Sequence, residues 1–295
     1  MTILHTPMHT IAEPRRVCTI AGDSKESMEG ATLACEVEAA RQVQQRLFPL
    51  ALPAIAGLDY CGLWRAARSV SGDYLDYFAL PGGNLGLAIG DVAGKGLPAA
   101  LLMSTLHGMV RALGLVRRGS LQRIMRTLNR LFFRVSPDNC FASLFLGRYD
   151  PVQQRLHFVN AGHEPPFVLR RDGSRWHTIP LEPGGPVIGM RHGHCYREGV
   201  VTLAAGDVLV AYTDGVSDVL NLQGEEWGSA RLLQTVQECA DSSAEEIAAH
   251  VMEEADAFAG AAPQQDDMTL CVARVRTAQR CPVLESEIML HATAA

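Results

Sequence analysis

Aspartates stand at the ends of several apolar, strand-like segments that lie far apart in the chain. Asp91 follows the apolar run 85–90, Asp214 follows the run 208–212, and a pair of aspartates precedes the run 268–275. The acids in such places are Asp73, Asp76, Asp91, Asp214, Asp266 and Asp267. Carboxylates gathered without basic partners raise one another's pKa, and a hard divalent cation removes that cost. Ligation by oxygen alone indicates Mg2+ or Mn2+ rather than Zn2+.

Two such cations could activate one water for attack on phosphorus. In two-metal sites the ions lie about 3.5–4 Å apart and direct the water in line at a phosphate. Arg68 stands five residues before Asp73, where it could bind a phosphate oxygen. The residue set lacks a convincing Cys or Ser nucleophile with a base, so metal-dependent phosphoester hydrolysis is the chemistry indicated. Taken alone, Asp91 fits equally an aspartate that begins a turn.

The glycine-rich turn after Asp91 differs from a P-loop. A P-loop has four residues between its first glycine and its Gly-Lys pair, whereas three separate Gly90 from Gly94. Gly96 also stands where a P-loop has Ser or Thr. Pro98 suits the first turn of a helix, because its missing N–H would have no partner there. We therefore expect a strand, an outward carboxylate, a turn and a helix.

Short turns between the strand-like segments predict antiparallel sheets, since a parallel return needs a dozen residues or more. Strands are expected over 58–67, 71–78, 85–90, 141–149, 155–161, 167–170, 208–212 and 268–275. Helices are expected over 31–48, 98–118, 217–220 and 229–238, and from 120 and 243 onward. Ser243 and Glu246 have the spacing of a capping box.

Composition excludes several classes of protein. The 295 residues are 47% hydrophobic and 20% charged, which is typical of a globular protein. A net charge of −6 argues against a nucleic-acid partner. No apolar run approaches the ~20 residues that cross a bilayer, so we expect no membrane partner. The 8 cysteines lack a C-x-x-C pair and indicate free thiols in a reducing cytoplasm.

The chain is predicted to have four parts. Residues 1–30 lack periodicity and are expected to form a flexible arm, and 277–295 form a tail without pattern. Residues 31–50 contain a helix with an apolar stripe, and 55–276 form one catalytic-sized domain. The helix 31–48 either packs on its own domain or serves as a signalling or dimerising helix.

Two further groups of residues have competing interpretations. Arg123, Arg126 and Arg130 line one face of the second helix, which is either a solvated surface or an anion site, and a solvated surface is the commoner case. His192, His194 and Cys195 could ligate zinc, but no second ligand pair stands at finger spacing. A loop with incidental histidines is the favoured interpretation there.

Five ordered motifs resemble the bacterial PP2C-type serine phosphatases of the SpoIIE/RsbU group, in the PPM family. The motifs are Ala66-Ala-Arg-Ser-Val-Ser-Gly-Asp-Tyr-Leu-Asp-Tyr-Phe78, Gly90-Asp-Val-Ala-Gly-Lys-Gly-Leu-Pro-Ala-Ala-Leu-Leu-Met103, Asn160-Ala-Gly-His-Glu-Pro-Pro166, Tyr212-Thr-Asp-Gly-Val-Ser217 and Gln265-Asp-Asp-Met-Thr-Leu270. The match covers roughly residues 33–275. It implies an α+β fold, a PP2C-like α/β/β/α sandwich of two antiparallel sheets flanked by helices.

The resemblance also implies roles for particular residues. Two ions, Mn2+ or Mg2+, would be held by Asp91, the Val92 carbonyl, Asp214 and Asp266, with Asp91 bridging both. Asp73 matches an acid that reaches a metal directly or through water, and Arg68 matches an arginine beside the phosphate. Supporting positions are Asp76, Gly94, Gly215 and Asp267. Ser71 departs from the glycine usual at its place, which bears on backbone geometry.

The function implied is a metal-dependent protein serine/threonine phosphatase in a partner-switching pathway. Its expected substrate is a phosphoserine on a STAS-domain anti-anti-sigma protein. An activator, or self-dimerisation through the helix 31–48, would supply the input. The alternatives are a catalytically weak binding module for the same partners and a small-molecule phosphoester hydrolase.

Overall fold

Two five-stranded sheets form the centre of the protein. The computed structural model describes residues 25–49, 51–116 and 119–276. The first sheet has the strand order β1 (Leu58–Arg65), β10 (Met268–Val275), β9 (Val208–Tyr212), β6 (Phe167–Asp172) and β7 (Arg175–Pro180). The second has the order β2 (Asp73–Leu80), β3 (Asn84–Val92), β4 (Ala142–Asp150), β5 (Arg155–Ala161) and β8 (Gly199–Thr202). All the paired strands in both sheets are antiparallel, as the short turns predict.

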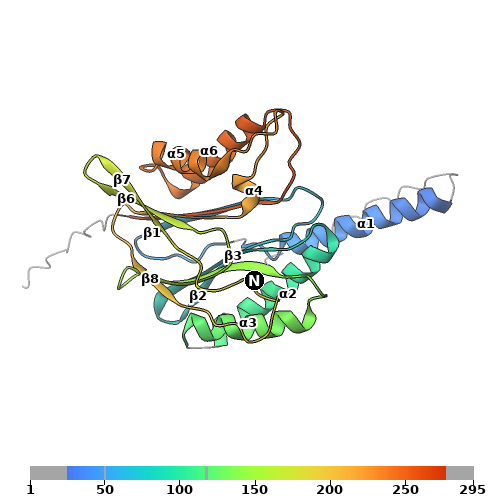
Figure 1. Ribbon diagram of the computed structural model, residues 1–295, viewed down its shortest axis with the longest axis horizontal. Helices are drawn as coiled ribbons and strands as arrows, with labels where there is room; N and C mark the ends of the chain where they lie inside the picture. The colour runs from blue at the N-terminus through green and yellow to red at the C-terminus, as the bar shows by residue number, and fades with distance from the viewer. Residues whose placement is uncertain (1–24, 50, 117–118, 277–295) are drawn as a thin grey trace, which may run out of the picture.

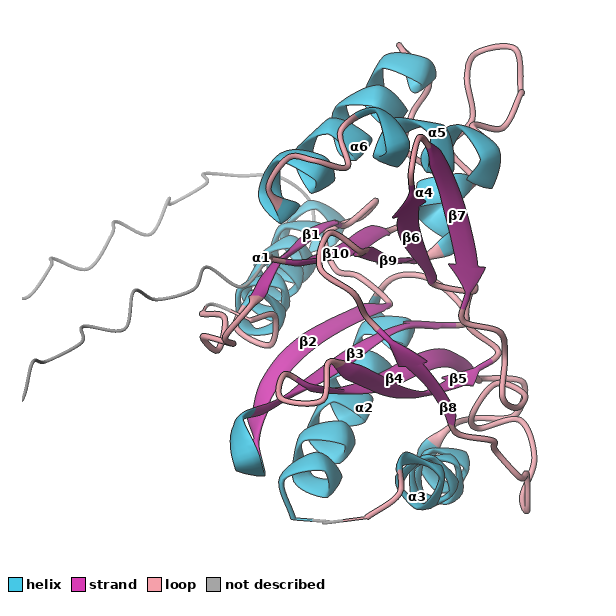
Figure 2. Cartoon of the chain, turned by 90° about the vertical axis from the view of Figure 1, so that its left-hand side faces the viewer, coloured by secondary structure: helices cyan, strands magenta, loops and turns pink. Residues whose placement is uncertain are grey.

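Helices cover the outer face of each sheet. The second sheet is covered by α2 (Leu97–Val116) and α3 (Leu121–Val135). The first is covered by α4 (Asp214–Ser217), α5 (Gly228–Glu238) and α6 (Ala244–Ala259), as Figure 2 shows. This four-layer arrangement confirms the expected α/β/β/α sandwich.

Strand alternation explains why β2 is buried throughout its first six residues. Leu75 and Tyr77 face the first sheet, where both would meet a Cβ placed on Gly62. The neighbouring residues Asp76 and Phe78 face α2 instead, where both contact Arg111. A strand covered on both faces has no solvent side, so the side chains on both of its faces are buried, Asp73 and Asp76 included.

The observed elements differ from the predicted ones at a few places. Strands β7 and β8 were not predicted, because their short segments alternate between partly buried and exposed positions without an apolar run. Helix α4 begins directly at Asp214, ahead of the predicted 217–220. The capping box of Ser243 and Glu246 is confirmed at the start of α6. The predicted tail lies outside the described residues, and so does the predicted arm except for 25–30, which are helical and correct the expectation of a flexible arm there.

Helix α1 (Lys25–Gln45) projects from one end of the sandwich (Figure 1). Its apolar stripe is only partly covered, since Leu33 is 56% and Val43 is 65% exposed. Its last turn is fixed more firmly, because Gln44 is buried and Phe48, just beyond the helix, stacks on Trp64 at 3.9 Å between ring centroids. No helix in the described part of the chain is long and apolar enough to span a membrane.

Candidate metal and phosphoester site

Asp73 and Asp91 face each other across β2 and β3. They are direct register partners, and Ser143 of β4 is the next partner in the same row. Side chains opposite each other in adjacent antiparallel strands project from the same face of a sheet. Asp73 Oδ2 accepts hydrogen bonds from Thr213 Oγ1 at 2.8 Å and from Thr269 Oγ1 at 2.6 Å. Both threonines belong to the first sheet, since Thr213 directly follows β9 and Thr269 lies in β10. This row of side chains therefore lies between the two sheets.

Asp214 and Asp266 reach the same place from the first sheet. Asp214 follows β9, and Asp266 precedes β10, the strand paired with β9. The residues that follow them, Gly215 and Asp267, are in close contact, because a Cβ on Gly215 would lie only 2.0 Å from the Asp267 carbonyl oxygen. Only glycine permits that approach, which gives Gly215 a structural reason to be part of the site.

The cluster of carboxylates is short of positive charge. Burial, reinforced by Asp214 and Asp266, raises the pKa of Asp91 to about 7. Burial, and next the charge of Asp266, raises the pKa of Asp214. Burial and the neighbouring Asp91 also raise the pKa of Asp73, against the opposing effect of its threonine hydrogen bonds. Asp91 thus affects Asp73, and Asp91 is itself affected by Asp214 and Asp266 of the other sheet.

Lys95 supplies positive charge to this cluster. Its Nζ lies 2.7 Å from Asp266 Oδ2 and donates to the Gln265 carbonyl at 2.9 Å. As the side chains stand, no three His, Cys, Asp or Glu residues of the described chain form a group that could hold a metal ion. The donors nevertheless suit a hard cation by chemistry, since all are carboxylate or carbonyl oxygens. Binding would require the carboxylates to turn toward a shared ion.

Asp267 anchors the loop that carries Arg68. Its Oδ1 accepts the Ala67 N–H at 2.7 Å and its Oδ2 accepts the Gly72 N–H at 2.7 Å. The same loop is held from the other side by Gln44, which bonds to both backbone groups of Ser71. Asp267 thus supports the site through the backbone.

The predicted phosphate arginine lies next to the glycine-rich turn. Arg68 is exposed, and its Nη1 is 3.8 Å from the position a Cβ would take on Gly96. Gly94 and Gly96 have φ values of 104° and 77°, which favour glycine. The turn also keeps Val92 close to the loop, since a Cβ on Gly72 would be 3.1 Å from the Val92 carbonyl oxygen. Arg68, Val92 and the turn therefore lie together beside Asp91.

Asp76 does not join the cluster. It lies three residues after Asp73, and alternation places it on the opposite face of β2. There it is fully buried and accepts from Arg111 of α2, with Nε at 2.5 Å and Nη2 at 2.6 Å. The expectation that Asp76 supports the metal site is therefore corrected, and its role is to hold α2 against the second sheet.

Four side chains that were not predicted to belong to the site also lie in it. His163 is buried and its Nδ1 lies 2.8 Å from Ser143 Oγ, next to Asp91 in the row described above. Thr213 and Thr269 fix Asp73, and Lys95 contacts Asp266. The signal for His163 and both threonines is their presence inside the quoted motifs beside the acids.

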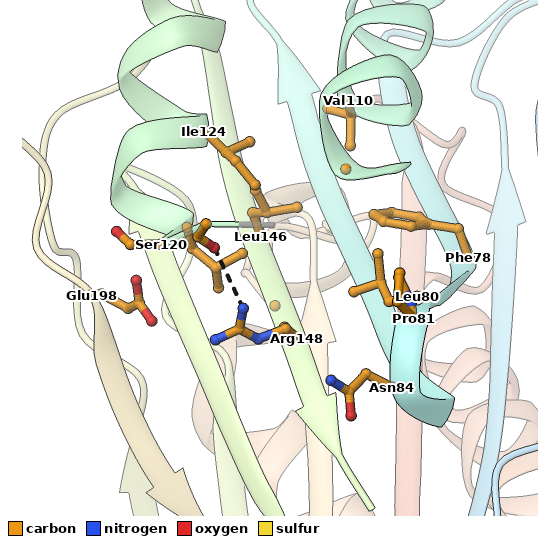
Figure 3. Close-up of a pocket in the computed structure, with 14 residues that line it drawn as sticks. Phe78, Leu80, Pro81, Asn84, Val110, Ser120, Ile124, Leu146, Arg148 and Glu198 are labelled. Carbon is orange, nitrogen blue, oxygen red and sulfur yellow. Dashed lines mark hydrogen bonds between the residues drawn. The ribbon is translucent and has the colours of Figure 1, made fainter. Parts of the chain in front are cut away.

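Of two cavities in the described structure, one adjoins the carboxylate cluster and the other does not. A polar cavity of about 390 Å³ adjoins the cluster and is lined by Asp266, Lys95 and Gly215 among others. A cavity of about 470 Å³ lies between α2, α3 and the second sheet, and Figure 3 shows its apolar lining, including Phe78 and Ile124. None of the converging aspartates lines this second cavity, so it is separate from the candidate site.

The fold is that of a PP2C-type domain. The solved SiaA-PP2C domain of Pseudomonas aeruginosa aligns with a TM-score of 0.70 and 21% identity, over 84% of this chain and 99% of that one. The sequence model of the family described as stage II sporulation protein E (SpoIIE) matches residues 81–276. The chain belongs to the SpoIIE family.

Two curated relatives are similar over most of the described residues. Protein IcfG of Synechocystis is 31% identical over 229 residues, which are 68% of this chain and 35% of IcfG. Phosphoserine phosphatase RsbU of Bacillus subtilis is 31% identical over 183 residues, 62% of this chain and 53% of RsbU. The chain thus matches about a third to a half of the length of these relatives.

Proposed function

We propose that the protein is a metal-dependent protein serine/threonine phosphatase whose catalytic domain spans residues 55–276. The observation that carries this proposal is the convergence of Asp73 and Asp91 from one sheet with Asp214 and Asp266 from the other. Membership of the SpoIIE family and similarity to a phosphoserine phosphatase, RsbU, support it.

Two Mn2+ or Mg2+ ions would be held by Asp91, the Val92 carbonyl, Asp214, Asp266 and Asp73. When bound, such ions supply an activated water and neutralise charge on the phosphate. Asp73 has one oxygen fixed by Thr213 and Thr269, so its other oxygen is the one available to an ion or to ion-bound water.

The other residues of the site bind and orient the phosphate. The Arg68 guanidinium, which is exposed beside the glycine turn, is placed to bind phosphate oxygens in the bidentate geometry that arginine favours. Asp267 and Gln44 keep the loop of Arg68 in position through its backbone. The ion pair between Lys95 and Asp266 would have to break when a cation binds Asp266. The Lys95 ammonium group would then be free at the edge of the site.

The substrate proposed is a phosphoserine on a STAS-domain anti-anti-sigma protein. The described cysteines are free thiols, which supports action in a reducing cytoplasm. Input would come from an activator or from self-dimerisation through the helix 31–48, whose exposed Leu33 and Val43 could be covered by another helix. A chain that starts at Leu52 tests this input, because unchanged rate, regulation and oligomeric state would exclude it.

Replacing Asp91 or Asp214 by Asn tests the proposed function. We expect Mn2+-dependent turnover of p-nitrophenyl phosphate and of a serine-phosphorylated STAS protein to be lost, while thermal unfolding remains cooperative. Retained turnover in either variant contradicts the metal assignment. Turnover of small esters without turnover of any phosphoprotein would favour the small-molecule hydrolase instead. Binding of the phosphoprotein without hydrolysis would favour the catalytically weak module.

A further inference from the structure

Helix α3 has one face formed by arginines. Leu121, Ile124, Leu128 and Phe132 of this helix are buried against the second sheet. The side chains on the outer face are exposed and basic: Arg123, Arg126, Arg130 and Arg134. Spacings of three and four residues place them along one stripe, which we call the arginine face. The helix contains no acidic residue. Among the described residues, none of these four arginines forms an ion pair; the arginines that do lie elsewhere in the chain.

A groove of about 270 Å³ runs between the arginine face and the loop 191–195. It is lined by Arg126, Arg130, His192 and His194 among others. The loop is held firmly, because the buried Asn129 of α3 accepts the Gly189 N–H at 2.8 Å and donates to the Arg191 carbonyl at 3.0 Å. Within the described residues, His194 Nε2 is buried and has no hydrogen-bond partner. The groove is thus a preformed concave surface with two exposed arginines on one wall.

The groove lies at the end of the second sheet that carries Asp91. The segment after α3 leads directly into β4, and the Phe141 carbonyl accepts the Ala93 N–H at 2.9 Å. The next residues of β4, Ala142 and Ser143, pair with Val92 and Asp91. The loop side of the groove is tied to the same end, because Ile188 and Ala142 exchange backbone hydrogen bonds of 2.8 and 2.9 Å. The groove and Asp91 are therefore tied to the same end of the second sheet.

Charge and burial select the kind of partner. The chain has a net charge of −6 and a pI near 5.9, so the arginine face is a local exception, whereas a nucleic-acid-binding domain is basic as a whole. A helix that binds a membrane surface inserts its apolar face, but the apolar face of α3 is buried against the sheet. An acidic protein segment is the remaining complement for unpaired arginines.

We propose that the arginine face and its groove dock an acidic segment of the phosphoprotein substrate. The proposal rests on the proposed function for the identity of the substrate, but the docking chemistry can be measured without catalysis. Exposed charges of this kind act mainly by steering encounter, so their effect should weaken as salt rises.

Binding of labelled poly-L-glutamate, followed by fluorescence anisotropy at low ionic strength, tests the docking. We expect the variant R126E/R130E to bind about tenfold more weakly than the unmodified protein, and R126Q/R130Q to fall between them. The matched control is R171E/R175E, which makes the same change in net charge on exposed positions of the β6–β7 hairpin in the other sheet. The control should bind poly-L-glutamate at least five times more tightly than R126E/R130E, and added salt should weaken binding by the unmodified protein.

A second arm links docking to turnover. Two phosphoserine peptides of equal length, one with a flexible Glu-rich extension and one with a Ser/Gly extension, are compared by kcat/KM. The Glu-rich peptide should be favoured about tenfold, and R126E/R130E should remove that advantage without changing turnover of p-nitrophenyl phosphate.

The outcomes separate the two proposals. Equal binding of poly-L-glutamate by R126E/R130E and the unmodified protein overturns the docking site. So does tighter binding of duplex DNA or of phosphatidylserine vesicles that is lost in the same variant. If p-nitrophenyl phosphate and the phosphopeptides are not hydrolysed at all, the proposed function fails, while the anisotropy result still decides the docking chemistry.

Discussion

Gln44 and Ser71 are joined by a pair of hydrogen bonds that link the projecting helix to the loop that carries Arg68. Gln44 Nε2 donates to the Ser71 carbonyl at 2.7 Å, and Gln44 Oε1 accepts the Ser71 N–H at 2.9 Å. Ser71 Oγ in turn accepts the Asp73 N–H at 3.0 Å. The last turn of α1 is therefore two hydrogen-bonded steps from one of the converging carboxylates.

Replacing Gln44 by Ala should reduce both stability and activity. Two buried backbone groups of Ser71 would lose their partners, at a cost of about 1–3 kcal/mol in the free energy of unfolding. Displacement of the loop should lower kcat for p-nitrophenyl phosphate by about tenfold or more. Q42A is the control, because Gln42 is exposed and bonds only to Glu38 among the described residues. Full kcat in a destabilised Q44A would mean that the contact is merely structural.

Replacing Arg111 by Ala should destabilise the fold without abolishing the chemistry. The Asp76 carboxylate would remain buried without its guanidinium, a loss of about 3–5 kcal/mol for a fully buried pair. Because the Arg111 side chain is 37% exposed, we expect the lower end of that range, measured by urea unfolding. The double variant D76N/R111M should regain part of the loss. A stable R111A protein with weakened Mn2+ binding would contradict the placement of Asp76 outside the metal site.

Replacing Gly215 by Ala should disturb the junction of Asp214 and Asp267. The added Cβ would lie 2.0 Å from the Asp267 carbonyl oxygen, so the backbone must move. We expect a loss of about 1–3 kcal/mol and strongly reduced turnover. The matched control is G108A in α2, where an added Cβ meets nothing within 4 Å. Because alanine favours the helix more than glycine does, G108A should raise the free energy of unfolding by about 0.5–1 kcal/mol. Equal activity of G215A and G108A would show that the close approach is not needed.

The buried His163 predicts a pH dependence of stability. Burial lowers its pKa to about 4, so the folded protein holds it neutral while the unfolded chain takes up a proton below pH ~6.5. The contribution of neutral His163 to the free energy of unfolding is therefore constant above pH ~6.5. It is lost as pH falls from there toward 4, by up to about 1.4 kcal/mol per pH unit. Urea unfolding of the unmodified protein and H163Q, at a series of pH values, isolates this contribution. Parallel curves for the two proteins would contradict it.

The sequence predicts most of the strands because their patterns are local. The strands over 155–161, 208–212 and 268–275 have the predicted bounds, since each is an apolar run closed by turn residues. The edge strands β7 and β8 lack such a run, because they have only one strand neighbour and partly exposed side chains. Register could not be predicted, although it is register that places Asp73 opposite Asp91.

Several contacts in the candidate site could not be predicted from local sequence patterns. Asp73 and Asp76 are three residues apart in one strand, so alternation separates their faces, but it does not reveal which of the two meets the other sheet and which meets α2. The contacts of Gln44 with Ser71 and of Lys95 with Asp266 join residues 27 and more than 100 positions apart, which no periodicity reveals. Tertiary packing, and not propensity, determines these relationships.

The most direct test is a crystal structure grown with Mn2+ and measured at the manganese absorption edge. We predict anomalous peaks for two ions at the end of the sandwich, in contact with Asp91 and with oxygens of Asp214 and Asp266. Peaks absent from that place while the protein is active, or manganese bound only by other residues, would contradict this prediction.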